Sequence, residues 1–222
     1  MPRLAPRPIL FFDFDNTITL GDVLDRVIER FSINEAWRLW ESEWQAGRIS
    51  TEECLRRQIG NLRASREELL QFVSSTDIDP AFTRIAAWAR SANIGLCVVS
   101  DNFRILVEAI LTHHGMTQIA LRANELDFHD GRVEARFPFR VPNCPRCAHC
   151  KAQHLSTTKM RPRIYVGDGL SDICPARIAD IVFAKDSLAS CLRREGVPFR
   201  PYGDLGEVLR YLQEHYGRPL RH

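Results

Sequence analysis

Three short strand-like runs of mainly apolar residues, each followed directly by a cluster of polar residues, constrain the fold of this chain more than any other feature. The clusters are, in chain order, Asp13-Phe14-Asp15-Asn16-Thr17 after residues 9–12, Ser100-Asp101-Asn102 after residues 94–99, and Gly167-Asp168-Gly169-Leu170-Ser171-Asp172 after residues 163–166. Short unbroken apolar runs are typical of strands buried on both faces of a parallel sheet. Open parallel sheets bind ligands at the carboxyl ends of their strands. The sequence therefore predicts an α/β fold with a doubly wound, mainly parallel Rossmann-like sheet, whose polar clusters meet along one edge.

The segment between the first two apolar runs predicts a separate helical unit. It is too long for a simple crossover and carries almost no strand signal. Capping boxes and one aspartate-proline pair indicate helix starts at Ser32-Glu35, Ser50-Glu53, Ser65-Glu68 and Asp79-Pro80. We expect a helical cap at residues 21–81, inserted between the first and second strands, and an α/β core at residues 1–20 and 82–222. Within the core, Asp130-Gly131 between alternating segments predicts a β-hairpin.

The composition is that of an ordinary globular protein. Of 222 residues, 45% are hydrophobic and 26% are charged, which argues against disorder. The formal net charge of +2 is too small, and the arginines are too scattered, to indicate a nucleic-acid partner. No apolar stretch reaches the roughly 20 residues of a membrane span, and the N-terminus lacks the apolar core of a signal peptide. We expect a cytoplasmic protein without nucleic-acid or membrane partners, either a monomer or a homodimer.

The order of the motifs resembles that of the haloacid dehalogenase superfamily. With Lys151 as the third motif, the pattern DxDxT, Ser, Lys, GDxxxD runs from Ile9 to about Phe183. Asp15 is similar to the residue that the phosphatases and phosphomutases of the superfamily carry and the dehalogenases lack. The resemblance implies a phosphomonoester hydrolase with a helical cap of the phosphoserine-phosphatase type, which uses Mg²⁺ on a small phosphorylated metabolite. A phosphomutase is the related alternative.

Within this resemblance, the first two aspartates have separate expected tasks. Asp13 is the expected nucleophile, because a carboxylate with an ordinary pKa of about 3.9 is ionised at neutral pH and forms an aspartyl-phosphate. Asp15 is the expected general acid and base, which protonates the leaving alcohol and then deprotonates the attacking water. Since Asp15 must hold a proton at working pH, we expect burial under the cap to raise its pKa.

The remaining motif residues are expected to neutralise and hold the phosphate. Mg²⁺ is expected on the side chains of Asp13 and Asp168 and on the main-chain carbonyl of Asp15, which are hard oxygen ligands. Lys151 supplies a fixed positive charge. The expected phosphate-binding residues are Thr17, Ser100, Asp101 and Asn102. Asp172 either positions Lys151 or a metal-bound water, or simply caps the following helix.

Two segments resemble a narrower branch of the superfamily. Residues 45–58, Gln-Ala-Gly-Arg-Ile-Ser-Thr-Glu-Glu-Cys-Leu-Arg-Arg-Gln, are similar to the phosphatases of methionine salvage, which act on 2-hydroxy-3-keto-5-methylthiopentenyl-1-phosphate. The hairpin and the segment Cys144-Pro145-Arg146-Cys147-Ala148-His149-Cys150-Lys151 resemble the same branch, which includes phosphoethanolamine/phosphocholine phosphatases. Ser100-Asp101-Asn102 departs from the Ser-Gly-Gly pattern of the salvage enzymes and is closer to the phosphocholine type. We expect the salvage phosphate as the substrate, with phosphoserine, and phosphoethanolamine or phosphocholine, as the alternatives.

Three further acidic residues have two interpretations each. Asp101 either meets the amine of a cationic substrate or caps the helix expected to begin near Phe103. Asp22 and Asp25 lie one turn apart on the first cap helix. They either face the substrate or solvate that helix.

The seven cysteines allow one more kind of site. Cys144, Cys147 and Cys150 have the spacing CxxCxxC, which a structural Zn²⁺ can use. The alternatives are a cysteine-lined loop that positions Lys151, or a disulfide formed under stress. The other four cysteines are expected to be buried small hydrophobic side chains: Cys54, Cys97, Cys174 and Cys191. A catalytically silent, zinc-stabilised binding module is the alternative from another functional class.

Overall fold

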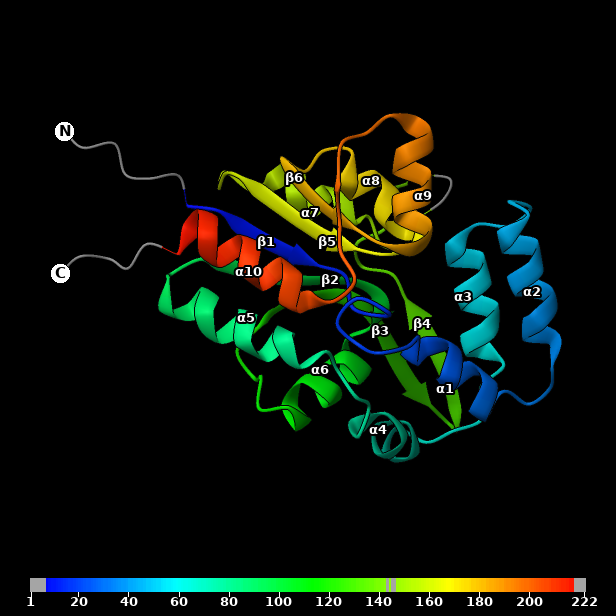
Figure 1. The fold of residues 1–222 in the computed structure, drawn as a ribbon. Helices are drawn as coiled ribbons and strands as arrows, with labels where there is room; N and C mark the ends of the chain where they lie inside the picture. The colour runs from blue at the N-terminus through cyan, green and yellow to red at the C-terminus, as the bar shows by residue number, and fades with distance from the viewer. Residues whose placement is uncertain (1–6, 143, 145–146, 218–222) are drawn as a thin grey trace.

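The core of the protein is a seven-stranded sheet with the strand order β4-β3-β2-β1-β5-β6-β7 (Figure 1). The computed structural model describes residues 7–142, 144 and 147–217. The strands are β1 (Ile9–Phe12), β2 (Gly95–Phe103), β3 (Ala120–His129), β4 (Arg132–Arg136), β5 (Arg163–Gly167), β6 (Ile181–Ala184) and β7 (Arg200–Pro201). All neighbouring strands are parallel except β3 and β4. The predicted doubly wound, mainly parallel fold is confirmed, and residues 1–6 and 218–222 of the predicted core lie outside the described residues.

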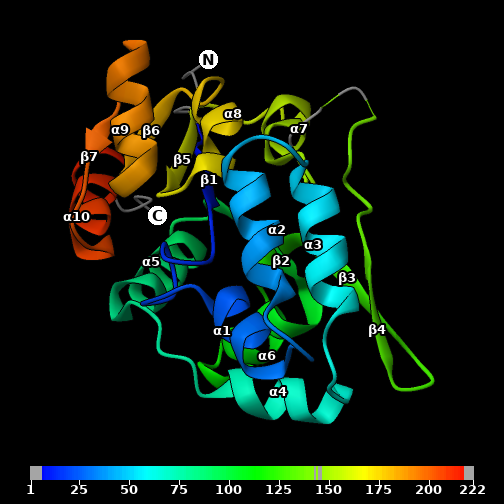
Figure 2. The ribbon, with the colours of Figure 1, turned by 90° about the vertical axis from the view of Figure 1, so that its right-hand side faces the viewer.

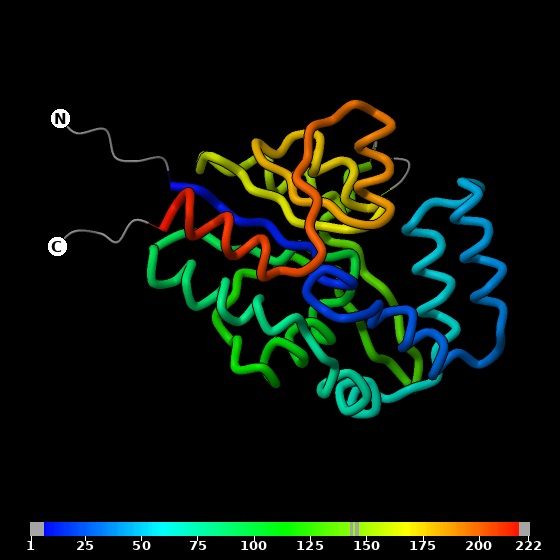
Figure 3. The backbone as a smooth tube through the Cα atoms, in the orientation of Figure 1, coloured from blue at the N-terminus to red at the C-terminus, as the bar shows by residue number. Residues whose placement is uncertain are grey.

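Four helices come between β1 and the helix that precedes β2, where the sequence predicts the cap. The helices are α1 (Val23–Phe31), α2 (Ala36–Gln45), α3 (Thr51–Gly60), α4 (Arg66–Ser74), α5 (Pro80–Ser91), α6 (Arg104–His113), α7 (Lys151–Thr157), α8 (Ile173–Ala176), α9 (Asp186–Glu195) and α10 (Leu205–Tyr216), with a 3₁₀ turn η1 at Leu170–Asp172. Figure 3 follows the chain from β1 through α1–α4 and back to the sheet. Figure 2 shows α2 and α3 side by side. No helix in the described ranges combines the length and apolar character needed to cross a membrane. The domain boundaries at residues 20 and 82 stay a prediction.

Three of the four helix starts in this region are capped as the sequence indicates. The side chains of Ser50, Ser65 and Asp79 each accept a backbone N–H at the start of their helix. The start at Ser32 is wrong, because Ser32 ends α1 and α2 begins after Glu35 without a side-chain cap. An isolated β-bridge pairs Ser32 with Leu62, so tertiary pairing outweighs the local capping signal there.

Both faces of the sheet are buried, as the unbroken apolar runs indicate. In β1, Leu10 and Phe12 belong to the large core that includes α5, α6 and α10, and the ring centroids of Phe12 and Phe82 lie 5.3 Å apart. Phe11 points to the opposite face, where it packs with Leu155 of α7 and Tyr165 of β5. Close packing on both faces holds β1 rigidly at the point where the first polar cluster begins.

The strand register brings the three polar clusters to one edge. Phe12 pairs with Val98 of β2 and with Val166 of β5, so the residues that follow all three strands are neighbours. One detail differs from the expectation, because β2 continues to Phe103 and therefore contains the second polar cluster. Its pairing with β3 is irregular between Val99 and Phe103, the stretch that carries this cluster.

The predicted hairpin is formed by β3 and β4. Its turn residues Asp130 and Gly131 have φ angles of 48° and 75°. Two consecutive positive φ angles are what a two-residue hairpin turn requires, and Asp-Gly accommodates them. The hairpin contacts α3, so the core approaches the cap helices on this side as well.

Candidate active site

Lys151, the first residue of α7, is buried among acidic side chains from the other three motifs. Its Nζ donates to Asp13 Oδ1 at 2.5 Å and to Asp172 Oδ1 at 2.8 Å. Asp101 Oδ2 lies 3.9 Å from the same nitrogen. Burial opposes the positive charge of Lys151, but the neighbouring carboxylates outweigh burial and raise its pKa. Lys151 is therefore a fixed cation at the carboxyl edge of the sheet.

The carboxylate of Asp172 is fully buried and accepts hydrogen bonds on both oxygens. Oδ1 accepts from Lys151 and, at 2.6 Å, from the Tyr165 hydroxyl. Oδ2 accepts from the backbone N–H groups of Asp168 and Gly169, each at 3.0 Å. A Cβ on Gly167 would lie 2.5 Å from Oδ2, so only glycine leaves room for this carboxylate. Asp172 therefore contacts Lys151 and closes the loop after β5, whereas its side chain makes no cap hydrogen bond to the following helix α8, so the helix-cap interpretation is wrong.

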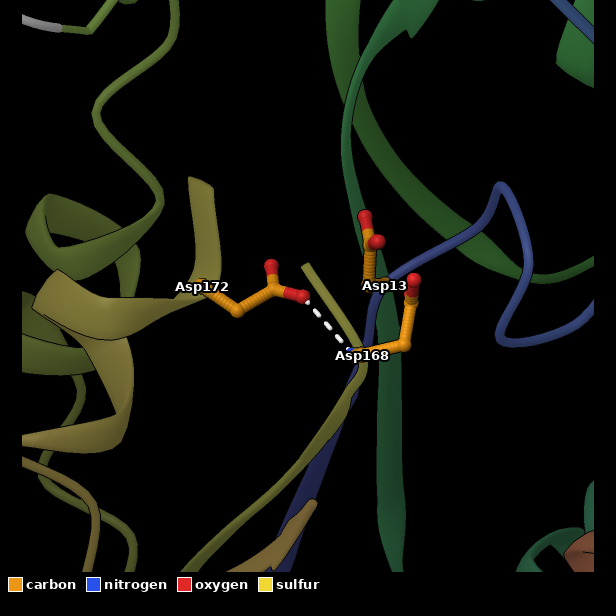
Figure 4. Close-up of side chains that lie close together, drawn as sticks. All are labelled: Asp13, Asp168 and Asp172. Carbon is orange, nitrogen blue, oxygen red and sulfur yellow. Dashed lines mark hydrogen bonds between the residues drawn. The ribbon is translucent and has the colours of Figure 1, made fainter. Parts of the chain in front are cut away.

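Three carboxylates form a compact acidic group. Oxygen atoms of Asp13, Asp168 and Asp172 lie within 4.8 Å of one another, and Figure 4 shows the first two carboxylates pointing to the same side. The Thr17 hydroxyl donates to Asp168 Oδ1 at 2.7 Å, so Thr17 positions Asp168. Burial first, and the charge of Asp172 second, raise the pKa of Asp13 well above its usual range, and the same two causes raise the pKa of Asp168 to about 6.

These raised pKa values reflect burial and repulsion among the carboxylates, which Lys151 offsets only in part. Both oxygens of Asp172 already accept hydrogen bonds from several donors, whereas Asp13 and Asp168 have carboxylate oxygens available for a cation. Hard carboxylate oxygens are the ligands that Mg²⁺ prefers, and a divalent cation would lower both pKa values. The residues present therefore fit a magnesium ion held by Asp13 and Asp168.

Asp15 is held by donors from two other segments. Its carboxylate accepts from the backbone N–H of Val23 at 2.9 Å and from the Asn102 side-chain amide at 3.0 and 3.2 Å. Burial is the main cause that raises the pKa of Asp15 to about 8, and the charge of Asp22 is the second. The raised pKa expected from burial is present, so this carboxyl group holds a proton at neutral pH. The bond to Val23 ties Asp15 directly to α1.

Two residues of the second cluster have partners that sequence reasoning did not anticipate. Ser100 is buried, and its Oγ accepts from the backbone N–H of Asn102 at 3.0 Å. Asn102 directs its amide to Asp15, which makes it a positioning residue for the expected acid. Their predicted contact with phosphate stays a prediction.

Asp101 faces the Lys151 side of the site. Burial first raises the pKa of Asp101, and the charge of Lys151 opposes this rise. Asp101 does not cap α6, whose N-cap residue is Phe103 and has no side-chain cap bond. The helix-cap interpretation of Asp101 is therefore wrong, because the side chain turns toward the buried ammonium instead.

A cavity of about 340 Å³ lies between this edge of the sheet and α1, α2 and α3. The residues that line it from the cap region are Asp22, Leu24, Asp25, Ile28, Glu41, Trp44, Thr51, Cys54, Leu55 and Gln58. Burial and the charge of Asp25 raise the pKa of Asp22 to about 6, and burial and the charge of Glu41 raise the pKa of Asp25. Asp22 and Asp25 both line the cavity, but Asp22 also caps α1 by accepting from the Asp25 N–H and Asp25 is exposed, so a contact of either residue with substrate stays a prediction. Among the described lining residues, Lys151 is the only basic one.

The cysteines fall into two groups. Cys54, Cys97 and Cys191 are buried, as expected. Cys174 is only half-buried, and the Cys147 thiol contacts both Cys174 and Cys144. The expectation that Cys174 is a buried hydrophobic side chain is therefore wrong, because α8 presents it to the segment before Lys151.

A family comparison agrees with the motif order and the fold. The haloacid dehalogenase-like hydrolases match residues 10–177. The chain belongs to this family. Because curated relatives in it are phosphatases, this chain is a phosphatase of the haloacid dehalogenase-like hydrolase family.

Relatives and solved structures cover nearly the whole of this phosphatase. A 2-hydroxy-3-keto-5-methylthiopentenyl-1-phosphate phosphatase from Brevibacillus brevis is 27% identical, over 95% of this chain and 97% of its own length. Pdp3-interacting factor 1 from Schizosaccharomyces pombe is 25% identical over 92% of this chain and 94% of its own. A substrate-bound phosphoserine phosphatase structure has a TM-score of 0.71 at 20% identity and covers 94% of this chain and 99% of its own. At that identity the structural likeness shows the fold.

Proposed function

We propose that this phosphatase is a Mg²⁺-dependent phosphomonoesterase for a small phosphate ester with a positively charged leaving group, such as phosphoethanolamine or phosphocholine. The observation that supports this proposal is the distribution of charged side chains around the cavity. Asp22, Asp25 and Glu41 line it from the cap region, while Lys151, at the bottom among the catalytic carboxylates, is the only basic residue of the described lining. This distribution of charge supports a substrate with a phosphate at one end and a cation at the other.

The core side chains supply the chemistry. Asp13 attacks phosphorus, and its new O–P bond forms as the ester O–P bond breaks, which leaves an aspartyl-phosphate. Asp15 donates its proton to the departing oxygen and then accepts a proton from the water that hydrolyses the aspartyl-phosphate. Lys151 opposes the rise in the pKa of Asp13 that burial and Asp172 cause, and it offsets the charge of the phosphate. Mg²⁺ on Asp13, Asp168 and the main-chain carbonyl of Asp15 supplies further charge neutralisation when it is bound.

The cavity wall formed by α1, α2 and α3 favours a substrate with a cationic leaving group over phosphoserine. Phosphoserine carries a carboxylate as well as an amine, and the described cap lining has no basic side chain to receive that carboxylate. An ammonium group would instead be attracted by Asp25 and Glu41. Trp44 in the same wall offers an aromatic ring of the kind that binds quaternary ammonium groups.

A second candidate substrate is the salvage phosphate named for the Brevibacillus brevis relative, which the sequence similarity favours. Its methylthio end would pack against the apolar part of the cap wall, formed by Leu24, Ile28 and Leu55. This substrate has no positive charge that could pair with the carboxylates of Asp22, Asp25 and Glu41. We therefore place it second.

The test compares two substrates that differ in one charge. Phosphocholine and its uncharged carbon isostere, 3,3-dimethylbutyl phosphate, have nearly the same shape. We expect kcat/KM for phosphocholine to be about tenfold higher or more, because a buried cation beside carboxylates and a ring gains roughly 1–2 kcal/mol. The Asp25→Asn and Glu41→Gln variants should bring this ratio toward one.

The matched control is Glu214→Gln, which removes one exposed carboxylate from α10, away from the cavity lining. It should leave the substrate ratio unchanged. A wild-type ratio near one contradicts the cationic leaving group. If the salvage phosphate is hydrolysed efficiently and the wild-type ratio is near one, the salvage phosphate becomes the preferred substrate.

A further inference from the structure

One helix of the cavity wall, α2, has little apolar packing of its own. None of its ten residues, all of them described, is buried, and among them only Trp37 packs against the large core. The same helix carries Glu41 and Trp44, which both line the cavity. Apolar packing alone therefore does not fix the direction in which α2 presents these two side chains.

The neighbouring helix α3 supplies hydrogen bonds to both side chains. The indole Nε1 of Trp44 donates to the Thr51 hydroxyl at 2.9 Å, and the side-chain amide of Gln58 donates to Glu41 Oε2 at 3.2 Å. The other oxygen of Glu41 accepts from Gln45 of its own helix, also at 3.2 Å. Figure 2 shows α2 and α3 side by side, which lets the first two bonds cross between them.

Thr51 and Gln58 belong to one face of α3. Four residues of this helix recur at helical spacing and line the cavity: Thr51, Cys54, Leu55 and Gln58. Cys54 and Leu55 are buried apolar side chains, as such a face predicts, whereas Gln58 is a glutamine with an exposed fraction of only 2%. Burying an amide costs free energy unless it is hydrogen-bonded, and the amide of Gln58 is bonded to a carboxylate of the cavity wall.

We propose that Thr51 and Gln58 are positioning residues for substrate selection, which hold the Trp44 ring and the Glu41 carboxylate toward the leaving group. This inference rests on the proposed function, because it assigns the ring and the carboxylate to a cationic leaving group. Side chains that are fixed in advance lose little freedom when the cation binds, so more of their attraction contributes to affinity. Loss of these bonds should therefore weaken substrate binding more than it slows the chemical step.

The test removes each bond while it keeps the size of the side chain. Thr51→Val lacks the acceptor for Trp44, and Gln58→Met lacks the donor to Glu41. In each variant the preference of kcat/KM for phosphocholine over 3,3-dimethylbutyl phosphate should fall about threefold or more, because a hydrogen bond contributes roughly that factor. The fall should come mainly from a higher KM for phosphocholine. Thr51→Ser keeps the hydroxyl and should retain the preference.

The matched control removes another contact between the same two helices. Glu43 of α2 lies 3.5 Å from Arg57 of α3, and neither residue belongs to the described lining of the cavity. Glu43→Gln should therefore keep the wild-type preference. Circular dichroism of all four variants checks that each is folded. The changes at Thr51 and Gln58 report independently, so one of them decides if the other variant is misfolded.

An unchanged preference in both Thr51→Val and Gln58→Met would overturn the inference, and so would an equal fall in Glu43→Gln, which would reflect a general loosening of the two helices. A loss in Thr51→Ser as large as in Thr51→Val would exclude the role of the hydroxyl.

Failure of the proposed function gives a different result, because the wild-type preference itself would then be near one, and the inference would be wrong with it. If the wild type prefers phosphocholine and Asp25→Asn loses this preference while both α3 variants keep it, the proposed function stands and only the positioning role is wrong.

Discussion

Replacing Asp172 with asparagine should destabilise the protein more than the same replacement at Asp13. Asp172 accepts from Lys151 and Tyr165 on one oxygen and from two backbone N–H groups on the other. An asparagine amide must turn its NH₂ toward one of these donor pairs, which leaves buried donors facing each other. Breaking a buried ion pair from one side costs about 3–5 kcal/mol.

Relief of the repulsion between Asp172 and Asp13 offsets part of this cost. We therefore expect Asp172→Asn to lower the free energy of unfolding by about 3 kcal/mol, the lower end of that range. For a chain of this length, that corresponds to a fall in Tm of about 6–12 °C. Asp13→Asn keeps the donors of Asp172 paired, and the loss of its own ion pair with Lys151 is offset by relief of the burial and repulsion that raise the pKa of Asp13, so we expect a smaller fall than for Asp172→Asn. Thermal unfolding of both variants, followed by circular dichroism, measures the difference. A Tm for Asp172→Asn within about 2 °C of the wild type, or a larger fall for Asp13→Asn, would refute this reasoning.

The remaining predictions concern turnover. Chelation should abolish activity and added Mg²⁺ should restore it, whereas full activity in excess chelator would exclude the metal-dependent proposal. Asp101→Asn should lower kcat/KM about equally for phosphocholine and its uncharged isostere, because Asp101 faces Lys151; a selective loss for phosphocholine would instead make it a reader of substrate charge. Asp22 is ionised above a pKa of about 6 and neutral below it, so KM for phosphocholine should rise relative to the isostere as the pH falls from about 7.5 to 5.5. An unchanged KM ratio across that range would remove Asp22 from cation binding.

The strands and the edge of the sheet that carries the site could be predicted because their signals are local. An unbroken apolar run defines a doubly buried strand, and the residues that follow it lie at the carboxyl edge. This reasoning placed Asp13, Asp168 and Asp172 near one another, and the structure brings them within 4.8 Å. The superfamily resemblance added Lys151, for which the chain around it has no comparable local pattern.

The contacts that the sequence did not reveal join residues far apart in the chain. Asn102 directs its amide to Asp15, and the hydroxyl of Thr17 reaches Asp168. Both depend on side-chain directions at the end of a strand, which an irregular register such as that of β2 changes. The helix start predicted at Ser32 is wrong for a similar reason, because the β-bridge between Ser32 and Leu62 outweighs the local capping pattern. Distant partners of this kind follow from packing rather than from spacing.

Direct trapping of the phosphorylated enzyme is the measurement that tests the central proposal, nucleophilic attack by Asp13. Asp15→Asn should still be phosphorylated but should hydrolyse the product slowly, because it lacks the group that activates water. After rapid quenching with a ³²P-labelled substrate, we expect the label on the peptide that contains Asp13, and no label on the Asp13→Asn variant. Substantial multiple turnover by Asp13→Asn, or label on another residue, would contradict the assignment.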